Sequence, residues 1–260
     1  MAWLLVAGLT TMFAALGWLV SDRRGATTFG FCALLAALAA YAFCDRAIMG
    51  SLGARRMTLA ENPVLASTVE RLSTRLALTP PRLALINDGF PRAFVVGRGP
   101  GSATLVISTA LVGAVSSDEL DAVLAHELAH VKRRDVLVQS FAVLLGSSVL
   151  ELARLGGWFR RGLVAVLAPI GAAFTHLLLS PRRELDADVL AAAVTDPLDL
   201  ASALEKLEAA GDLVSFSGSP ATEPLYTVSP FDESDRITRQ FSTHPPTADR
   251  VARLRREAAN

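Results

Sequence analysis

The chain has 260 residues, a length that suits one domain with additional segments or two small domains. Hydrophobic residues make up 52% of it, charged residues only 19%, and the mean hydropathy is +0.40, which together exclude an ordinary soluble enzyme. The formal net charge is zero, so the composition points away from nucleic acid as a partner.

The first 45 residues contain two uncharged apolar runs, residues 2–20 and 26–44. A helix rises about 1.5 Å per residue, so about 20 residues span the hydrocarbon core of a bilayer. Residues 21–25 form a polar turn between the runs, and the pattern predicts a transmembrane hairpin. A signal peptide is the alternative; the lack of basic residues before the first run and the presence of the second run argue against it.

Residues 61–78 have the pattern of an amphipathic helix, with Asn62 as its cap and Pro63 in its first turn. The character of the sequence then changes. Three short β-prone runs follow, separated by Gly, Pro, Asn and Asp, at residues 83–86, 93–97 and 103–107. They predict a small sheet just before the centre of the chain.

The outer strand of such a sheet could pair with an extended peptide by strand addition, as many proteases hold their substrates. A sheet that only supports the following helix is an equally good interpretation.

The centre of the chain carries the sequence HELAH at residues 126–130. On a helix, His126 and His130 project from one face a single turn apart, so both imidazoles can reach one metal ion. Glu127 lies beside that ion, close enough to take a proton from a bound water. This is the HExxH signature of zinc hydrolases.

The residues around this motif predict the helix that it requires. Ser116 followed by Glu119 indicates a capping box, and an apolar stripe at helical spacing comes next. No proline or glycine interrupts residues 117–135. The motif therefore lies on a well-specified helix.

A second pair of apolar runs, residues 136–150 and 162–179, follows this helix. The shorter run covers only about 22 Å, so it spans a bilayer only if its helix continues through Trp158. We expect the pair to form a second membrane hairpin. Buried or interfacial helices packed on the catalytic domain are the alternative.

A third metal ligand has several candidates. The remaining histidines are His176 and His244, while Glu184 and Asp188 lie four apart on one face of a helix predicted over residues 180–194. One of these carboxylates could bind the metal while the other supports the site. For this carboxylate pair, a solvated charged helix face is the alternative.

Two further helices and a long connection complete the prediction. One helix covers residues 197–210, capped by Asp196 and ended by Gly211, and the other covers residues 248–257. Residues 211–243 contain no predicted element. A loop of that length is usually functional or disordered.

These motifs together resemble the HtpX-type membrane zinc metalloproteases, which are related to the CAAX prenyl endopeptidases. The resemblance covers nearly the whole chain and rests on ATLVISTALVGAVSSDELDAVLAHELAHVKRRD, SPRRELDAD and STHPPTADRVARL. It implies that His126, His130 and Glu184 hold one zinc ion and that Glu127 is the general base.

The resemblance extends to other residues. It implies that Asp188 supports a zinc-bound histidine and that His244 lines the site and helps to polarise the scissile carbonyl; a structural cap before the last helix is the alternative for His244. Family members often carry Asn-Ala-Phe on the substrate-side strand, whereas this chain has Arg92 in the Asn position. No substrate role is therefore carried over to Arg92, while the residues that follow it stay the candidate substrate strand: Ala93, Phe94, Val95, Val96 and Gly97. His176 has no family counterpart and is expected to be packed or to lie at the membrane interface.

We therefore expect a mainly helical α+β fold: a zincin-type metalloprotease core with a small β-sheet, an N-terminal transmembrane hairpin and a second hairpin after the HExxH helix. The expected function is a zinc endopeptidase that cleaves misfolded membrane proteins in a bacterial plasma membrane. The basic residues near the segment ends favour a cytoplasmic catalytic domain. A signalling protease and a catalytically inactive scaffold of the same fold are the alternatives. The expected boundaries are 1–45 and 136–179 for the hairpins, and 46–135 and 180–260 for the two parts of the protease domain.

Overall fold

The computed structural model describes residues 2–154, 162, 169, 172–173, 175–176, 179–213, 220–229, 242 and 244–259. The second run of the expected second hairpin therefore lies largely outside the described residues, as does most of the connection 211–243. The described residues include the whole helix predicted around HELAH and the helix predicted over residues 180–194.

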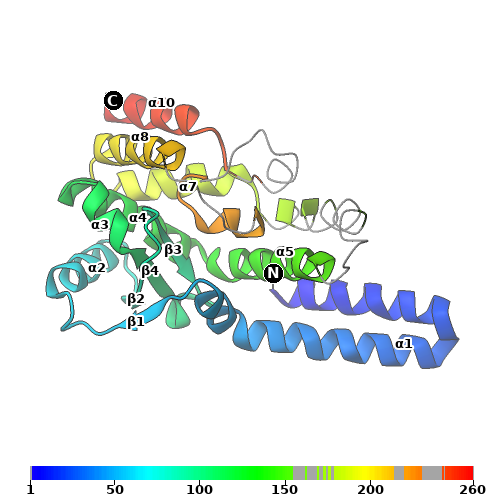
Figure 1. Cartoon of the computed structure of the whole chain (residues 1–260). Coiled ribbons are helices and arrows are strands. Elements are labelled where there is room, and N and C mark those ends of the chain that lie inside the picture. Colours follow the sequence, from blue (N-terminus) through cyan, green and yellow to red (C-terminus); the bar gives the residue numbers. More distant parts are fainter. Residues whose placement is uncertain are drawn as a thin grey trace.

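Helix α1 (Ala2–Ser51) consists of two antiparallel arms, seen side by side in Figure 1. The turn between them falls at Ser21 and Asp22, whose backbone angles are not helical, and this confirms the predicted helical hairpin. Gly17 and Gly25 allow the arms to touch, because a Cβ on either would collide with the carbonyl oxygen of the other.

This hairpin projects from the rest of the described chain (Figure 1), and most of its large apolar side chains are exposed. Among the described residues, one helical stretch, Val6–Ser51, is long and apolar enough to cross a membrane. The second arm continues beyond residue 44, where the apolar run ends. Its last turns are helical because Ile48 and Met49 are buried against the sheet.

The sheet has four strands in the order β1 (Arg55–Met57), β2 (Arg82–Ile86), β4 (Thr104–Ser108) and β3 (Ala93–Val96). Strand β2 is parallel to β4, and the other two pairings are antiparallel. The three predicted strands are confirmed, and β3 lies at an edge. Strand β1 was not predicted.

Both faces of the sheet are covered, and side chains alternate between the two faces along each strand. Val95 and Leu105 face a core shared with α2 (Pro63–Arg75), α4 (Ser117–Arg133), α8 (Pro197–Leu213) and α10 (Thr247–Ala258). Phe94 and Val106 face a second core, which is closed by the end of α1, by α5 (Val136–Arg154) and by Tyr226. The sheet is therefore buried between two layers.

Helix α4 (Ser117–Arg133) lies between the sheet and a layer formed by α7 (Pro181–Ala192) and α8 (Pro197–Leu213) (Figure 1). The predicted capping box is present: the Ser116 hydroxyl accepts from the Glu119 N–H, and the Glu119 carboxylate accepts from the Ser116 N–H. The other described helical elements are α2 (Pro63–Arg75), η1 (Pro100–Ser102), α3 (Thr109–Ala114), α5 (Val136–Arg154), η3 (Pro220–Leu225) and α10 (Thr247–Ala258).

Two expectations about the C-terminal part were wrong. Helix α8 passes through Gly211 and ends at Leu213, because a glycine inside a helix costs only about 1 kcal/mol and α8 is packed on α4 and α10. The stretch 211–243 is not without structure, since it contains η3. Tertiary contacts hold η3, among them a hydrogen bond from the Gln139 amide to the Pro224 carbonyl.

Candidate metal centre

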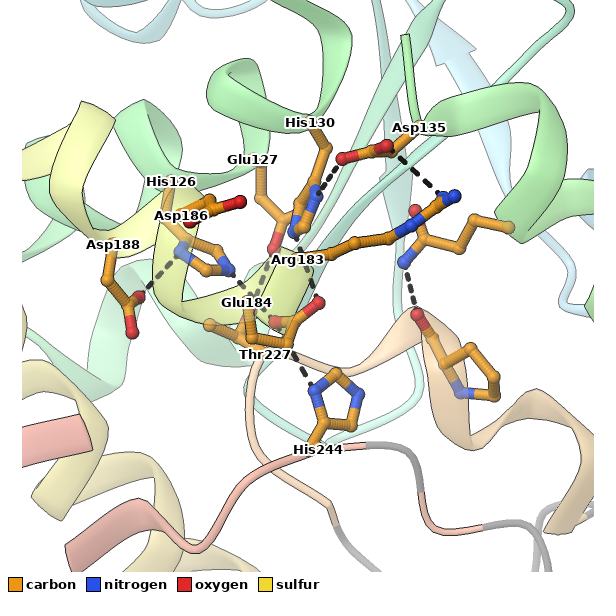
Figure 2. Close-up of polar contacts among 12 residues, drawn as sticks. His126, Glu127, His130, Asp135, Arg183, Glu184, Asp186, Asp188, Thr227 and His244 are labelled. Carbon is orange, nitrogen blue, oxygen red and sulfur yellow. Dashed lines mark hydrogen bonds and ion pairs between the residues drawn. The ribbon is translucent and has the colours of Figure 1, made fainter. Parts of the chain in front are cut away.

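Helices α4 and α7 bring three potential metal ligands together (Figure 2). His126 Nε2 lies 3.4 Å from Glu184 Oε2, and His130 Nε2 lies 3.5 Å from Glu184 Oε1. One ligand atom from each of the three residues lies within 4.8 Å of the others, and all three residues are buried. The two histidines of HELAH are thus joined by a carboxylate from a helix much later in the chain.

The geometry fits a small tetrahedral ion. Two ligand atoms about 2.1 Å from such an ion lie about 3.4 Å from each other, close to the distances between the imidazoles and Glu184. His126 Nε2 and Glu184 Oε2 are also buried without a hydrogen-bond partner among the described residues, and unpaired buried polar atoms of this kind are costly. Two imidazoles and one carboxylate form a ligand set typical of catalytic zinc.

Asp188 lies behind the first histidine, with Oδ1 2.9 Å from His126 Nδ1. Burial lowers the pKa of His126, but Asp188 and Glu184 outweigh burial and raise it to about 9 in the metal-free chain. Asp188 is itself held by Arg250 of α10 through two hydrogen bonds, and both residues are buried. A carboxylate at Nδ1 leaves Nε2 of His126 for the metal.

Asp135 has the matching place behind the second histidine, with Oδ2 3.7 Å from His130 Nδ1. It lies two residues after the end of α4, and its carboxylate is paired with Arg133 at 3.1 Å and with Arg183 at 3.2 Å. Burial acts to raise the pKa of Asp135, but His130 and the two arginines lower it. Sequence reasoning missed this residue, because it lies outside the HELAH motif and directly follows three basic residues, 132–134.

Glu127 is buried beside the ligands, and its Oε1 accepts a hydrogen bond of 2.9 Å from the Thr227 hydroxyl. Burial raises the pKa of Glu127, although the neighbouring imidazoles and Thr227 act in the opposite direction. A carboxyl group with a raised pKa is a good proton acceptor and donor near neutral pH. Sequence reasoning also missed Thr227, which lies in the stretch expected to contain no element.

His244 approaches from the segment before α10, and its Nδ1 lies 3.3 Å from Glu184 Oε2. Burial acts to raise the pKa of Glu184, but His244, His130 and His126 hold it well below its usual range. A cavity of about 10 Å³, room for roughly one water molecule, lies between His130, Glu184 and His244. The side chain of His176 is exposed and is not one of the three clustered ligands.

The candidate substrate strand β3 is an edge strand, but all five residues 93–97 are buried. Its outer edge contacts the chain itself: Gly97 N–H donates to the Ser140 hydroxyl at 3.3 Å, and the Thr227 hydroxyl lies 3.4 Å from the Ala93 carbonyl oxygen. Arg92, just before the strand, is buried and donates to Asp88 and Tyr226.

Comparison with known proteins places this site in a family. The model of peptidase family M48 matches residues 59–258, which include all three clustered ligands. The chain belongs to peptidase family M48. Within the chain, the M48 match begins shortly after the α1 hairpin and ends in α10.

Curated relatives extend the match over nearly the full length. A protein named protease HtpX homolog from Pyrococcus abyssi is 35% identical over 98% of this chain and 94% of its own length. One of the same name from Acidiphilium cryptum is 35% identical over 98% of this chain and 95% of its own. The resemblance to HtpX-type proteases that the motifs predicted is thereby confirmed.

A solved structure agrees at the level of the M48 fold. The crystal structure of Ste24p from S. mikatae superposes with a TM-score of 0.54 at 19% identity and covers 96% of this chain. This chain spans 62% of the length of that structure. At this identity the likeness concerns the fold alone.

Proposed function

We propose that the chain is a membrane-bound zinc endopeptidase that cleaves extended segments of misfolded membrane proteins. The observation that carries this proposal is the buried cluster of His126, His130 and Glu184 with Glu127 beside it. The M48 family and the relatives named protease HtpX homolog support peptide-bond hydrolysis as the reaction. The ligand set, two imidazoles and one carboxylate, favours zinc over the harder divalent ions.

The ligands and the general base have separate tasks. His126, His130 and Glu184 would hold the zinc ion, which when bound lowers the pKa of water and polarises the scissile carbonyl. Glu127 takes the proton of the attacking water and later passes it to the leaving amine. Its burial supports this role, because a desolvated carboxylate holds a proton more readily near neutral pH.

His244 is proposed to donate a hydrogen bond to the scissile carbonyl oxygen as negative charge develops there. Its place beside Glu184 and in the lining of the small cavity supports this role. Its sequence position just before α10 is also compatible with a structural cap. A His244→Ala variant that loses kcat but keeps zinc and thermal stability would support the catalytic role.

Substrate binding is proposed to use the outer edge of β3. Ala93, Val95 and Gly97 direct their backbone groups away from β4, since the Arg92 carbonyl accepts from Ser108 and alternate residues face opposite edges. An extended peptide would take over contacts such as the one between Gly97 and Ser140. Residues 93–97 therefore remain the candidate substrate strand.

The membrane arrangement is part of the proposal. The exposed apolar surface of α1 supports a transmembrane hairpin at residues 1–45, with a lipid bilayer as a partner. Residues 136–179 are proposed as a second hairpin inserted between the two parts of the protease domain, which faces the cytoplasm. A topology reporter fused after Gly157 tests this: a cytoplasmic signal there, with the protease domain also cytoplasmic, refutes the second hairpin.

The catalytic proposal is tested with the full-length chain in detergent, loaded with zinc. We expect it to cut itself or casein, and we expect Glu127→Gln to abolish cleavage while retaining about one zinc per chain. Glu205→Gln, at an exposed carboxylate on α8, is the matched control and should cleave normally. Equal cleavage by Glu127→Gln would contradict the role of Glu127, and no cleavage by any variant would favour an inactive scaffold.

A further inference from the structure

Thr227 lies beside the proposed general base, Glu127 (Figure 2), and also contacts two other parts of the fold. Its hydroxyl lies 2.9 Å from Glu127 Oε1 and 3.4 Å from the Ala93 carbonyl oxygen. A hydroxyl has one proton to donate, and the shorter distance assigns that proton to Glu127. The side chain is buried, so water does not substitute for it readily.

The backbone of Thr227 is held from the side of α10. Arg250 donates from Nη1 to the Thr227 carbonyl oxygen at 2.7 Å, while its other nitrogens bind Asp188. One guanidinium therefore contacts both the residue behind His126 and the residue beside Glu127. This fixes Thr227 on its C-terminal side.

The preceding residue is held from the side of the sheet. Arg92 donates one nitrogen to the Tyr226 hydroxyl and another to the Asp88 carboxylate. Its guanidinium also lies over two aromatic rings, 4.9 Å from the centroid of Tyr226 and 5.5 Å from that of Phe94. A buried arginine with two hydrogen-bonded partners and two ring contacts is a rigid clamp, and it anchors the segment at Tyr226.

We propose that Thr227 is a positioning residue for the general base and that Arg92 acts through Tyr226 to hold Thr227 in place. Arg92 is where the chain departs from the Asn-Ala-Phe pattern of HtpX-like proteases, so this support belongs to this chain's own sequence. The proposal rests on the proposed function, since it assigns Glu127 as the base. With Oε1 engaged by Thr227, Oε2 is the oxygen that this proposal assigns to proton transfer.

The first test compares two substitutions of Thr227 in the full-length, zinc-loaded chain. A quenched fluorescent peptide, built on a casein site that the chain cuts, reports kcat and KM. We expect Thr227→Val, which keeps the shape but removes the hydroxyl, to lower kcat about tenfold to a hundredfold, as for other lost hydrogen bonds to charged groups. KM and zinc content should stay unchanged. Thr227→Ser should restore most of kcat.

Thr195→Val is the matched control. Within the described chain its hydroxyl bonds to the Ala191 carbonyl at the end of α7, away from the metal ligands, and kcat should be unchanged. If Thr227→Val and Thr227→Ser have the same kcat, the hydroxyl does not position Glu127 and the proposal is overturned. If Thr227→Val loses zinc or raises KM while kcat stays at the wild-type value, Thr227 has a merely structural role.

The second test asks whether Arg92 acts through Thr227. Arg92→Lys keeps the charge but cannot bridge Asp88 and Tyr226 with a planar fork, so kcat should fall. In the Thr227→Val background the same substitution should lower kcat no further, because coupled residues are not additive. Fully additive losses would remove Arg92 from the proposal. The Glu127→Gln variant distinguishes a failure of the proposed function from a failure of this inference. If Glu127→Gln cleaves normally, the proposed function fails. If only Thr227→Val cleaves normally, this inference alone fails.

Discussion

Arg250 and Asp188 form a fully buried ion pair through two hydrogen bonds, from Nε to Oδ2 at 2.9 Å and from Nη2 to Oδ1 at 2.7 Å. Asp188 in turn lies 2.9 Å from His126. Helix α10 thus reaches His126, a candidate metal ligand on α4, through one carboxylate. It is therefore part of the candidate metal centre.

Replacing Arg250 with methionine should lower the free energy of unfolding of the chain. The substitution takes both arginine hydrogen bonds from the buried Asp188 and leaves it only His126, and breaking a buried ion pair typically costs about 3–5 kcal/mol. Arg255→Met, on the same helix but in an exposed pair with Glu205, should cost less than about 1 kcal/mol. Thermal unfolding in detergent measures both, and similar losses for the two variants would contradict the importance of the buried pair.

Replacing Asp135 with asparagine should weaken zinc binding. Residues that support a metal-bound histidine typically contribute about tenfold to a hundredfold in affinity, and Asp135 is the carboxylate nearest to His130 Nδ1. Competition with a chelator measures the effect. Asp186→Asn, which also loses a pairing with Arg133 but does not contact the histidine, should bind zinc normally. A normal affinity for both would remove Asp135 from the site.

Zinc binding should depend on pH through His126. The pKa of this imidazole is raised to about 9 in the metal-free chain, so below that pH zinc must displace a proton. The apparent affinity should therefore rise by about tenfold per pH unit from pH 6.5 towards 9 for one released proton. Titration in weak and strong buffers counts the protons released. In Asp188→Asn, which lacks the carboxylate that raises the pKa, this dependence should move to lower pH.

The Glu119 cap should stabilise the chain only above acidic pH. Burial acts to raise the pKa of Glu119, but Lys206, Ser202 and Ser116 outweigh it and lower the pKa to about 2. A lowered pKa gives stability that is complete above about 4.5 and is lost as pH falls through about 2. Glu119→Gln should cost about 1 kcal/mol at pH 7, and the difference from wild type should shrink between pH 4 and 2. Melting curves of the metal-free forms test this; a constant difference would contradict it.

The features that were predicted correctly from the sequence are determined by residues that lie close together in the chain. Ser116 and Glu119 cap α4 through residues three apart, and HELAH places two histidines on one face by helical spacing alone. Glu184 and Asp188 lie one turn apart on α7, so their proximity was also predictable from the sequence. The choice of Glu184 as the ligand came from family resemblance, because spacing does not distinguish it from Asp188.

The features that were missed depend on contacts between distant parts of the chain. Strand β1 is three residues with two arginines, and only its pairing with β2 makes it a strand. Thr227 lies in a stretch without periodicity, and Arg250 reads as one of several basic residues on a surface helix. Their roles follow from packing against β3 and α7, which a single sequence does not reveal.

The junction between α1 and the sheet has a mechanical consequence. Only residues 52–54 separate the end of the second arm from β1, and Ile48 and Met49 are packed into the core behind the sheet. With α1 embedded in a bilayer, this short and packed connection would hold the candidate metal centre at a fixed distance from the lipid. The distance of a peptide bond from the membrane surface would then decide whether it can reach the site, whatever side chains flank it.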